Sequence, residues 1–191
     1  KPLEKNEYEI QTKFSLTKNL KIVSFGKYNK DKIFYIIRRT PGSGLFSNLI
    51  FVLNHISICN SFNLIPIIDM KNFTTIYNEK NKIYGHYNAW EYYFEKLNKY
   101  SLKEVYQSRN VIFCNSIFAH NMSLNIRQEK TKKIFNKIKI KKNITDKFNS
   151  FIKQNLKKSE KILGIHFAGS TYKIVKTHPF PPTVNILIEE V

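Results

Sequence analysis

Cysteine is scarce in this chain, since only Cys59 and Cys114 occur among 191 residues. The two positions are far apart and match no metal-ligand spacing. This excludes a small disulfide-stapled scaffold and argues against a structural zinc site. A reducing compartment is therefore the simpler expectation.

Long apolar runs are also missing. No stretch of about 18 consecutive apolar residues occurs, and the first residues (KPLEK) lack the apolar core of a signal peptide. No internal repeat or low-complexity linker divides the chain. We therefore expect a soluble protein built around one main core.

Acidic residues are few, because 14 Asp and Glu face 32 Lys and Arg and leave a net charge of +18. Such a field attracts anionic partners. Many lysines lie in the runs 130–133 and 137–142, which is typical of solvated helix faces. No zinc-finger, RNP or helix-turn-helix pattern accompanies the charge, so no nucleic-acid partner is expected. Peripheral contact with an anionic membrane stays open, because basic clusters beside Phe and Ile can dock there.

Apolar residues make up 42% of the chain, with 15 Phe and 11 Tyr, as in a globular domain. Short β-like runs alternate with helical stretches, which favours an α/β fold with a Rossmann-like parallel sheet and flanking helices. The expected strands are 33–37, 64–69, 111–113 and 162–167. The expected helices are 45–60 and a basic pair within 124–158, broken near 143–146. Residues 33–69 then form a β-α-β unit with parallel strands.

The first candidate site is the turn 42–48 (GSGLFSN), between a predicted strand and a predicted helix. Gly42 and Gly44 would let backbone N–H groups approach a phosphate or sugar, and the helix N-terminus adds positive potential. Asn48 ends this turn. The spacing fits neither the dinucleotide fingerprint nor a Walker loop, so an ordinary βα turn is the alternative.

The second candidate is Asp69, which ends its predicted strand. It could act as a base, and Tyr77 and Asn78 behind it suit sugar hydroxyls. An Asp that caps the turn is the alternative interpretation. Trp90 and Glu91 form a third candidate within the aromatic run 90–94, where Trp90 could stack on a sugar ring. Helical spacing of aromatics is, however, also typical of a core.

The fourth candidate is the loop after the last predicted strand. It brings together His166, Ser170, Thr171, Lys173 and His178, and Lys173 could neutralise a diphosphate as a point charge. Polar groups at a strand end before a helix favour phosphate or a sugar nucleotide as the ligand. Structural hydrogen bonding by the histidines is the alternative. No nucleophilic triad and no carboxylate cluster for a metal occurs.

Two of these segments resemble the fucosyltransferase superfamily, which includes the α-1,6-fucosyltransferases and the protein O-fucosyltransferases. The turn 42–48 is similar to the family's glycine-asparagine loop, and Asp69 matches the acidic end of the next strand. The run 164–173 (GIHFAGSTYK), with His178 following, is similar to its donor-binding motif. The position that carries the motif's arginine is Ala168 here. Another cation such as Lys173, an arginine elsewhere, binding without catalysis, or a changed residue would each account for that departure.

The resemblance implies a GT-B architecture, with an acceptor-side lobe at 1–160 and the start of a donor-binding lobe at 161–191. It also implies inverting transfer from a nucleotide-diphosphate sugar, with GDP favoured, to a glycan hydroxyl, without an essential metal or other cofactor.

In this hypothesis His166, Lys173 and His178 contact the donor, Asp69 or Glu91 orients or deprotonates the acceptor, and Trp90 forms its platform. The composition suits a bacterial surface-glycan pathway at the cytoplasmic face of a membrane. A catalytically inactive carbohydrate- or anion-binding domain is the alternative, and a basic nucleic-acid binder ranks third.

Overall fold

A computed structural model of the chain describes residues 22–39, 42–114 and 134–156. The chain divides into two compact units, Lys1–Lys147 and Phe148–Val191. The expected boundary at 160 and the predicted strand 162–167 lie outside the described residues and stay predictions.

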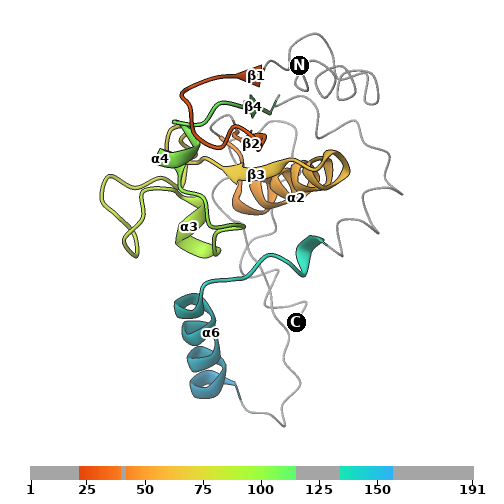
Figure 1. The fold of residues 1–191 in the computed structure, drawn as a ribbon. Coiled ribbons are helices and arrows are strands. Elements are labelled where there is room, and N and C mark those ends of the chain that lie inside the picture. The colour runs from red at the N-terminus through yellow and green to blue at the C-terminus, as the bar shows by residue number, and fades with distance from the viewer. Residues whose placement is uncertain (1–21, 40–41, 115–133, 157–191) are drawn as a thin grey trace, which may run out of the picture. The chain divides into compact units, whose positions relative to one another are not determined.

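The first unit contains a mixed sheet of four strands (Figure 1). They are β1 (Ile22–Val23), β2 (Phe34–Ile37), β3 (Ile65–Ile68) and β4 (Val111–Phe113), arranged in the order β1-β4-β2-β3. Strand β2 runs parallel to both β3 and β4, whereas β1 is antiparallel to β4. The predicted parallel β-α-β unit is confirmed, and so is the α/β class. The antiparallel strand β1 was not predicted, because two residues carry no readable alternation.

Strand β2 is buried on both faces, which explains its uninterrupted apolar sequence. Tyr35 and Ile37 join a core cluster with residues of the long helix, whereas Phe34 and Ile36 join a second cluster with Val105. Successive side chains of a strand point to opposite faces, so β2 separates two apolar layers. The side chains of β3 and β4 are divided between the same two clusters, with Ile68 and Ile112 in the first and Ile67 and Val111 in the second.

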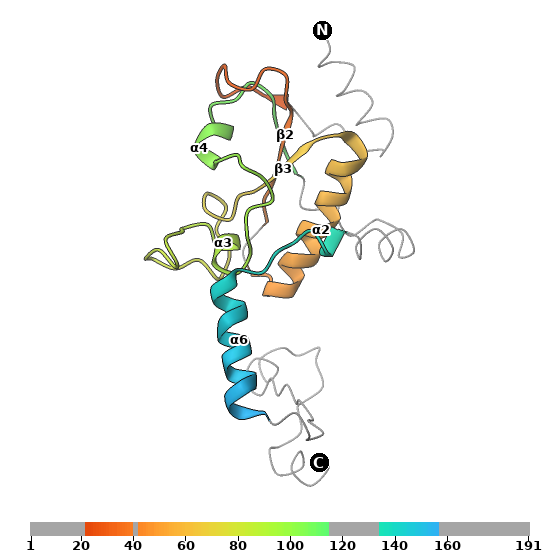
Figure 2. The ribbon, with the colours of Figure 1, turned by 60° about the horizontal axis from the view of Figure 1, so that its bottom comes forward.

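Helix α2 (Leu45–Phe62) covers the first of these layers, as Figure 2 shows. It ends at Asn63, a residue with a left-handed backbone whose N–H bonds to the carbonyl of Cys59. In the described part of the chain, α2 is long and apolar enough to cross a membrane by length and hydropathy alone. The share of it that is buried inside the fold, 61%, explains this apolarity as that of a core helix.

The outer edge of β3 is closed to a further strand. Pro66 has no N–H to offer a neighbour, and its carbonyl accepts a hydrogen bond of 2.7 Å from the side chain of Asn98. The carbonyl of Ile68 accepts one of 2.9 Å from the side chain of Asn88. Side-chain amides thus hold carbonyl groups that a further strand would use, and in the described part of the chain the sheet ends at β3.

The segment after β3 is mostly irregular, as its aromatic-rich sequence indicates. It contains two short helices, α3 (Trp90–Tyr93) and α4 (Leu102–Val105). Ser101 caps α4, since its hydroxyl accepts a bond of 3.1 Å from the N–H of Glu104. The side of the sheet opposite α2 is covered by α4, which places Val105 against β2.

Helix α6 (Lys142–Asn155) corrects the predicted helix break. The break predicted at 143–146 lies earlier, where residues 138–141 run extended and Ile140 pairs with Phe94. The N–H of Lys141 donates to the carbonyl of Tyr93, so this segment is hydrogen-bonded to the end of α3. Backbone pairing of that kind has no signature in a lysine-rich sequence.

Candidate functional site

The carboxyl ends of the three parallel strands meet at one edge of the sheet. Strand β2 continues into Arg38, β3 into Asp69 and β4 into Cys114. The chain leaves β2 toward β3 on one side and later returns to pair β4 on the other side. The point between β2 and β4 is therefore a topological switch point, where open α/β sheets place their ligands.

Two arginines follow β2 at this edge. The Arg38 guanidinium lies between the rings of Phe73 and Phe113, with its central carbon 4.7 and 4.9 Å from their centroids. The Arg39 guanidinium lies 4.6 Å from the ring of Phe51. Neither forms an ion pair with a carboxylate of the described residues. Aromatic stacking therefore holds both cations in place without neutralising them.

Arg39 has an incomplete set of hydrogen bonds. One of its terminal nitrogens donates to the hydroxyl of Ser47 at 3.0 Å. Its Nε is buried and has no partner among the described residues. Partial burial lowers the pKa of Arg39, because the charged form loses hydration. An anion at this position would restore both the charge balance and the missing bond.

The N-terminus of α2 lies in the same turn. Gly42 has a φ of +102°, which favours glycine, and Gly44 is the N-cap and carries no side chain to close the helix. The N–H of Leu45 donates to the hydroxyl of Tyr77 at 2.8 Å. The first turn contains no acidic residue, so the positive end of the helix dipole is not neutralised within it.

Asn48 is 3% exposed and faces inward from the first turns of α2. Its amide nitrogen donates to the carbonyl of Ser43 at 3.2 Å and closes the glycine turn. Its Oδ1 has no partner among the described residues. Asn48, Tyr77 and Trp90, three residues predicted from separate segments, line one hollow. Its volume of about 10 Å³ holds one water molecule at most, so no sugar fits there in this conformation.

Asp69 is fully buried and its carboxylate accepts four hydrogen bonds. Oδ1 accepts from the N–H groups of Lys71 and Asn72, at 3.1 and 2.9 Å. Oδ2 accepts from the Asn72 side chain at 2.8 Å and from the Tyr106 hydroxyl at 2.7 Å. Burial and this bond to Asp69 raise the pKa of Tyr106. The geometry favours the turn-capping alternative, and the catalytic role of Asp69 stays a prediction.

Glu91 is buried and belongs to a chain of polar contacts. Its Oε1 accepts a bond of 3.1 Å from the Asn88 side chain, and its Oε2 lies 2.9 Å from Nδ1 of His86. Nε2 of His86 lies 2.9 Å from Nζ of Lys141. A carboxylate that orients an imidazole is a common arrangement for proton transfer, yet here the far nitrogen already has a partner. Glu91 therefore positions His86 and joins Lys141 to the aromatic segment.

The predicted acceptor residues occupy structural positions. Trp90 is 3% exposed, its ring centroid lies 4.4 Å from that of Phe94, and its Nε1 donates to the carbonyl of Glu95. This favours the core alternative that the helical spacing left open. Asn78 uses its amide to donate to the carbonyls of Met70 and Tyr87, at 2.6 and 3.2 Å. Asn78 thus stabilises the irregular segment.

The predicted donor-contact residues at the end of the chain lie outside the described residues. They are His166, Ser170, Thr171, Lys173 and His178, together with Ala168. Arg38, Arg39 and His86 were not among the predicted site residues. The Arg-Arg pair directly after a buried strand was a signal for the two arginines, whereas His86 had no signal in the sequence.

The described residues contain no group of three or more His, Cys, Asp or Glu that could hold a metal ion. Both cysteines are free and buried. Burial raises the pKa of Cys114 to about 11, and its thiol is bonded to the backbone of Arg38. A thiol of this kind is held protonated and suits a structural role.

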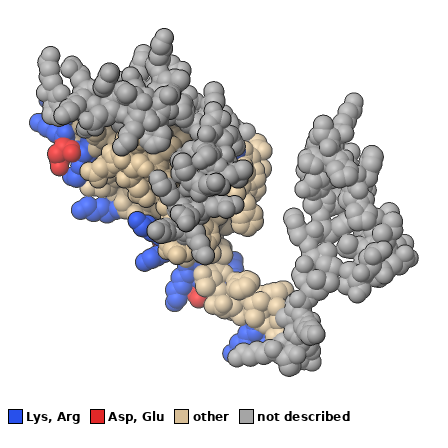
Figure 3. All heavy atoms as spheres, turned by 90° about the vertical axis from the view of Figure 1, so that its right-hand side faces the viewer, with Lys and Arg blue, Asp and Glu red and all other residues tan. Residues whose placement is uncertain are grey.

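The fold and the site together define an α/β protein with a cationic carboxyl edge. Among the described side chains visible in Figure 3, those of Lys and Arg outnumber those of Asp and Glu. Comparisons with protein family models, with curated proteins and with solved structures find no match.

Proposed function

We propose that this edge of the sheet binds the phosphate groups of a nucleotide-diphosphate sugar, and that the protein is a glycosyltransferase of the fucosyltransferase-like type. The observation that carries the proposal is Arg39, which contacts Ser47 in the first turn of α2 and lacks a carboxylate partner among the described residues. Arg38, also without such a partner, stacks on Phe73 and Phe113 at the same edge of the sheet, on the face away from α2. The fork of a guanidinium matches phosphate oxygens bidentately, and a helix N-terminus attracts the same charge.

This proposal addresses the departure at Ala168 from the family pattern. Loss of an arginine from the donor motif removes a cation that would stabilise the leaving diphosphate. Arg39 is an arginine from another segment, and its Nε at the switch point has no partner among the described residues. It is therefore our candidate for the substitute. Transfer with inversion to a glycan hydroxyl, near an anionic membrane at its cytoplasmic face, belongs to the same proposal.

Thermal-shift titrations of the chain with GDP, UDP, CDP and ADP test this proposal, because a ligand that binds only the folded state raises Tm. GMP and guanosine show whether the diphosphate carries the effect. The variant Arg39→Gln is expected to weaken binding about tenfold or more, as for loss of a charge-assisted hydrogen bond. Arg109→Gln is the matched control, because Arg109 is exposed and lies just before β4, at the opposite end of that strand from the proposed site.

Three outcomes contradict the proposal. The first is no Tm shift with any nucleoside diphosphate. The second is an equal shift with guanosine and GDP, because then the phosphates contribute nothing. The third is equal weakening by the substitutions at Arg39 and Arg109, which would indicate attraction by overall charge alone.

A catalytically inactive carbohydrate- or anion-binding domain is the second candidate. It is favoured by the hydrogen bonds that occupy the carboxylate oxygens of Asp69 and Glu91, since an occupied carboxylate is a poor base. Nucleotide binding without sugar transfer or sugar-nucleotide hydrolysis by the full-length protein would support this candidate over the enzyme.

A further inference from the structure

Tyr84 has a backbone conformation that is unusual for a tyrosine. Three described residues other than glycine have a positive φ, and two of them are asparagines, Asn29 and Asn63. The third is Tyr84, with a φ of 49°. A bulky aromatic residue in the left-handed region is unusual, whereas asparagine is the common choice there.

Tyr84 and Gly85 are the two central residues of a tight turn. The N–H and carbonyl groups of Ile83 and His86 bond to each other in both directions at 3.0 Å. Gly85 also has a positive φ, of 83°, so the turn has the pattern of a type I′ turn. Asn-Gly is the favoured pair for that turn. The turn itself therefore gives no reason for a tyrosine at this position.

The turn is anchored to the body of the first unit. His86 contacts Glu91 and Lys141 at 2.9 Å each. The carbonyl of Tyr87 accepts bonds from the Asn78 side chain and from the hydroxyl of Tyr92, at 3.2 and 3.3 Å. These contacts fix the backbone on the carboxyl side of the turn. They do not cover Tyr84 or Tyr87, which are 47% and 45% exposed.

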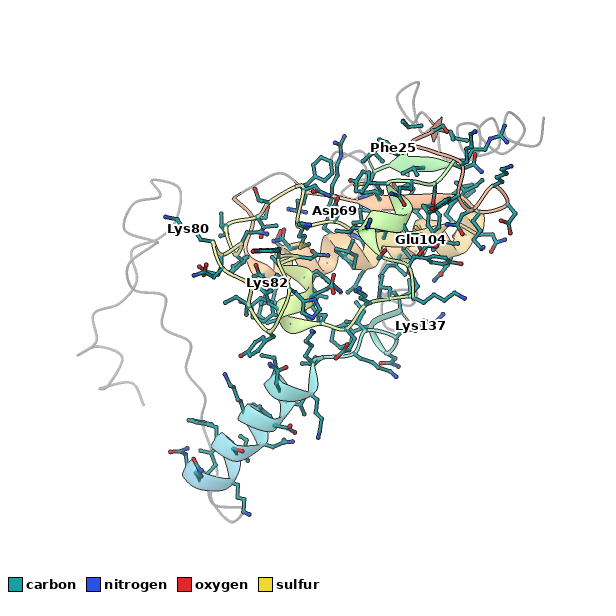
Figure 4. The ribbon with its side chains drawn as sticks, turned by 60° about the vertical axis from the view of Figure 1, so that its left-hand side comes forward. Phe25, Asp69, Lys80, Lys82, Glu104 and Lys137 are labelled. Carbon is teal, nitrogen blue, oxygen red and sulfur yellow. The ribbon has the colours of Figure 1, made fainter. Side chains whose placement is uncertain are left out.

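Lysines accompany both exposed rings. Nζ of Lys82 lies 5.4 Å from the ring centroid of Tyr87. Nζ of Lys147 lies 5.5 Å from that of Tyr84 and donates to its hydroxyl at 3.0 Å. Figure 4 shows Lys80 and Lys82 on the loop between β3 and α3, well apart from Asp69. Two exposed tyrosines, each with a lysine beside its ring, therefore lie at one anchored turn, and we call Lys82, Tyr84, Tyr87 and Lys147 the Tyr84 surface.

We propose that the Tyr84 surface binds an anionic carbohydrate chain. Sugar rings stack on the faces of Tyr84 and Tyr87, while carboxylate or sulfate groups on the sugars pair with Lys82 and Lys147. The choice of a carbohydrate rests on the proposed function, whose acceptor is a glycan. Two tyrosines at one tight turn are few for a nucleic-acid track, which stacks several bases in a row.

Calorimetric titration of the chain with a hyaluronan hexasaccharide, which carries one carboxylate per disaccharide, tests this inference. A neutral dextran oligosaccharide and an oligothymidylate serve as comparison ligands. We expect hyaluronan to bind more tightly than either. We also expect Lys82→Gln to weaken binding and to reduce its dependence on salt.

The decisive variant is Tyr84→Asn. It removes the ring but suits the positive φ, so its Tm is expected to equal or exceed that of the wild type. Hyaluronan binding is expected to weaken about three- to tenfold, as for loss of one aromatic contact. Tyr28→Ala is the matched control, because Tyr28 is 56% exposed in a different loop and should not affect binding.

Unchanged affinity in Tyr84→Asn would overturn the inference, and so would tighter binding of the oligothymidylate than of hyaluronan. Absence of hyaluronan binding would overturn it as well. The nucleotide titrations separate this failure from that of the proposed function. A GDP shift without hyaluronan binding refutes only the Tyr84 surface, whereas hyaluronan binding without any nucleotide shift refutes only the donor site.

Discussion

His55 makes the stability of this fold depend on pH in a direction that can be measured. The residue is fully buried in α2, and its Nδ1 lies 3.0 Å from the hydroxyl of Tyr35. Its Nε2 has no partner among the described residues. Burial first, and the charge of Arg39 second, lower the pKa of His55 from 6.5 to about 4.

A lowered histidine pKa reduces stability in acid. Below pH 6.5 the unfolded chain takes up a proton at this residue, whereas the folded protein does so only near pH 4. The free energy of unfolding therefore falls as the pH is lowered from 6.5 toward 4. With these two pKa values, the loss attributable to His55 is about 2 kcal/mol between pH 7.5 and pH 5, and about 3 kcal/mol below pH 4.

Urea unfolding of the wild type and of His55→Gln at pH 7.5 and pH 5 measures this effect. Glutamine gains no proton in this range and retains an acceptor for Tyr35. We expect the wild type to lose about 2 kcal/mol more than the variant between the two pH values. The difference between the two proteins removes the contribution of other titrating groups. An equal loss in both proteins would refute the argument, because His55 would then be protonated without cost to the fold.

Three further substitutions test the packing around the site by the same unfolding measurement. Tyr106→Phe removes the 2.7 Å bond to the buried Asp69 carboxylate and should lower stability by about 2 kcal/mol. Asn88→Ala leaves the carbonyl of Ile68 and the N–H of Met70 without their partner and should cost about 2 kcal/mol or more. Gly26→Ala would place its Cβ against the backbone carbonyl oxygen of Gln107, and we expect it to lower the free energy of unfolding by about 1–3 kcal/mol.

Each of these predictions has a result that contradicts it. Tyr106→Phe and Asn88→Ala should not resemble exposed substitutions, whose effects stay within about 0.5 kcal/mol. An effect that small would mean that water replaces the lost bonds. An unchanged stability of Gly26→Ala would mean that the loop at 107 moves aside freely.

Local pattern was sufficient for the elements with strong periodicity. The apolar run before Arg38 predicted a strand, and the spacing of apolar residues after Gly44 predicted α2, which ends within two residues of the expected position. The β-α-β order predicted parallel pairing of β2 with β3. The two-residue strand β1 and the extended pairing at Ile140 went unseen, since neither carries a period long enough to detect.

The candidate site could likewise be predicted only in part from the sequence. The sequence by itself determined that polar and glycine residues follow the strands, because a parallel β-α-β unit sends all its strand ends to one edge. It left open whether Asp69, Glu91 and Trp90 are functional or structural. That was decided by burial and by the partners that hold them, which come from segments distant in the chain, such as Tyr106 for Asp69. Tertiary packing also set Arg39 beside the first turn of α2, and Arg38 on the other face of the sheet, without an acidic partner among the described residues. It left Tyr84 exposed on a turn that would favour asparagine. Spacing along a chain predicts elements, but only tertiary packing decides which polar groups are already satisfied and which remain available to a ligand.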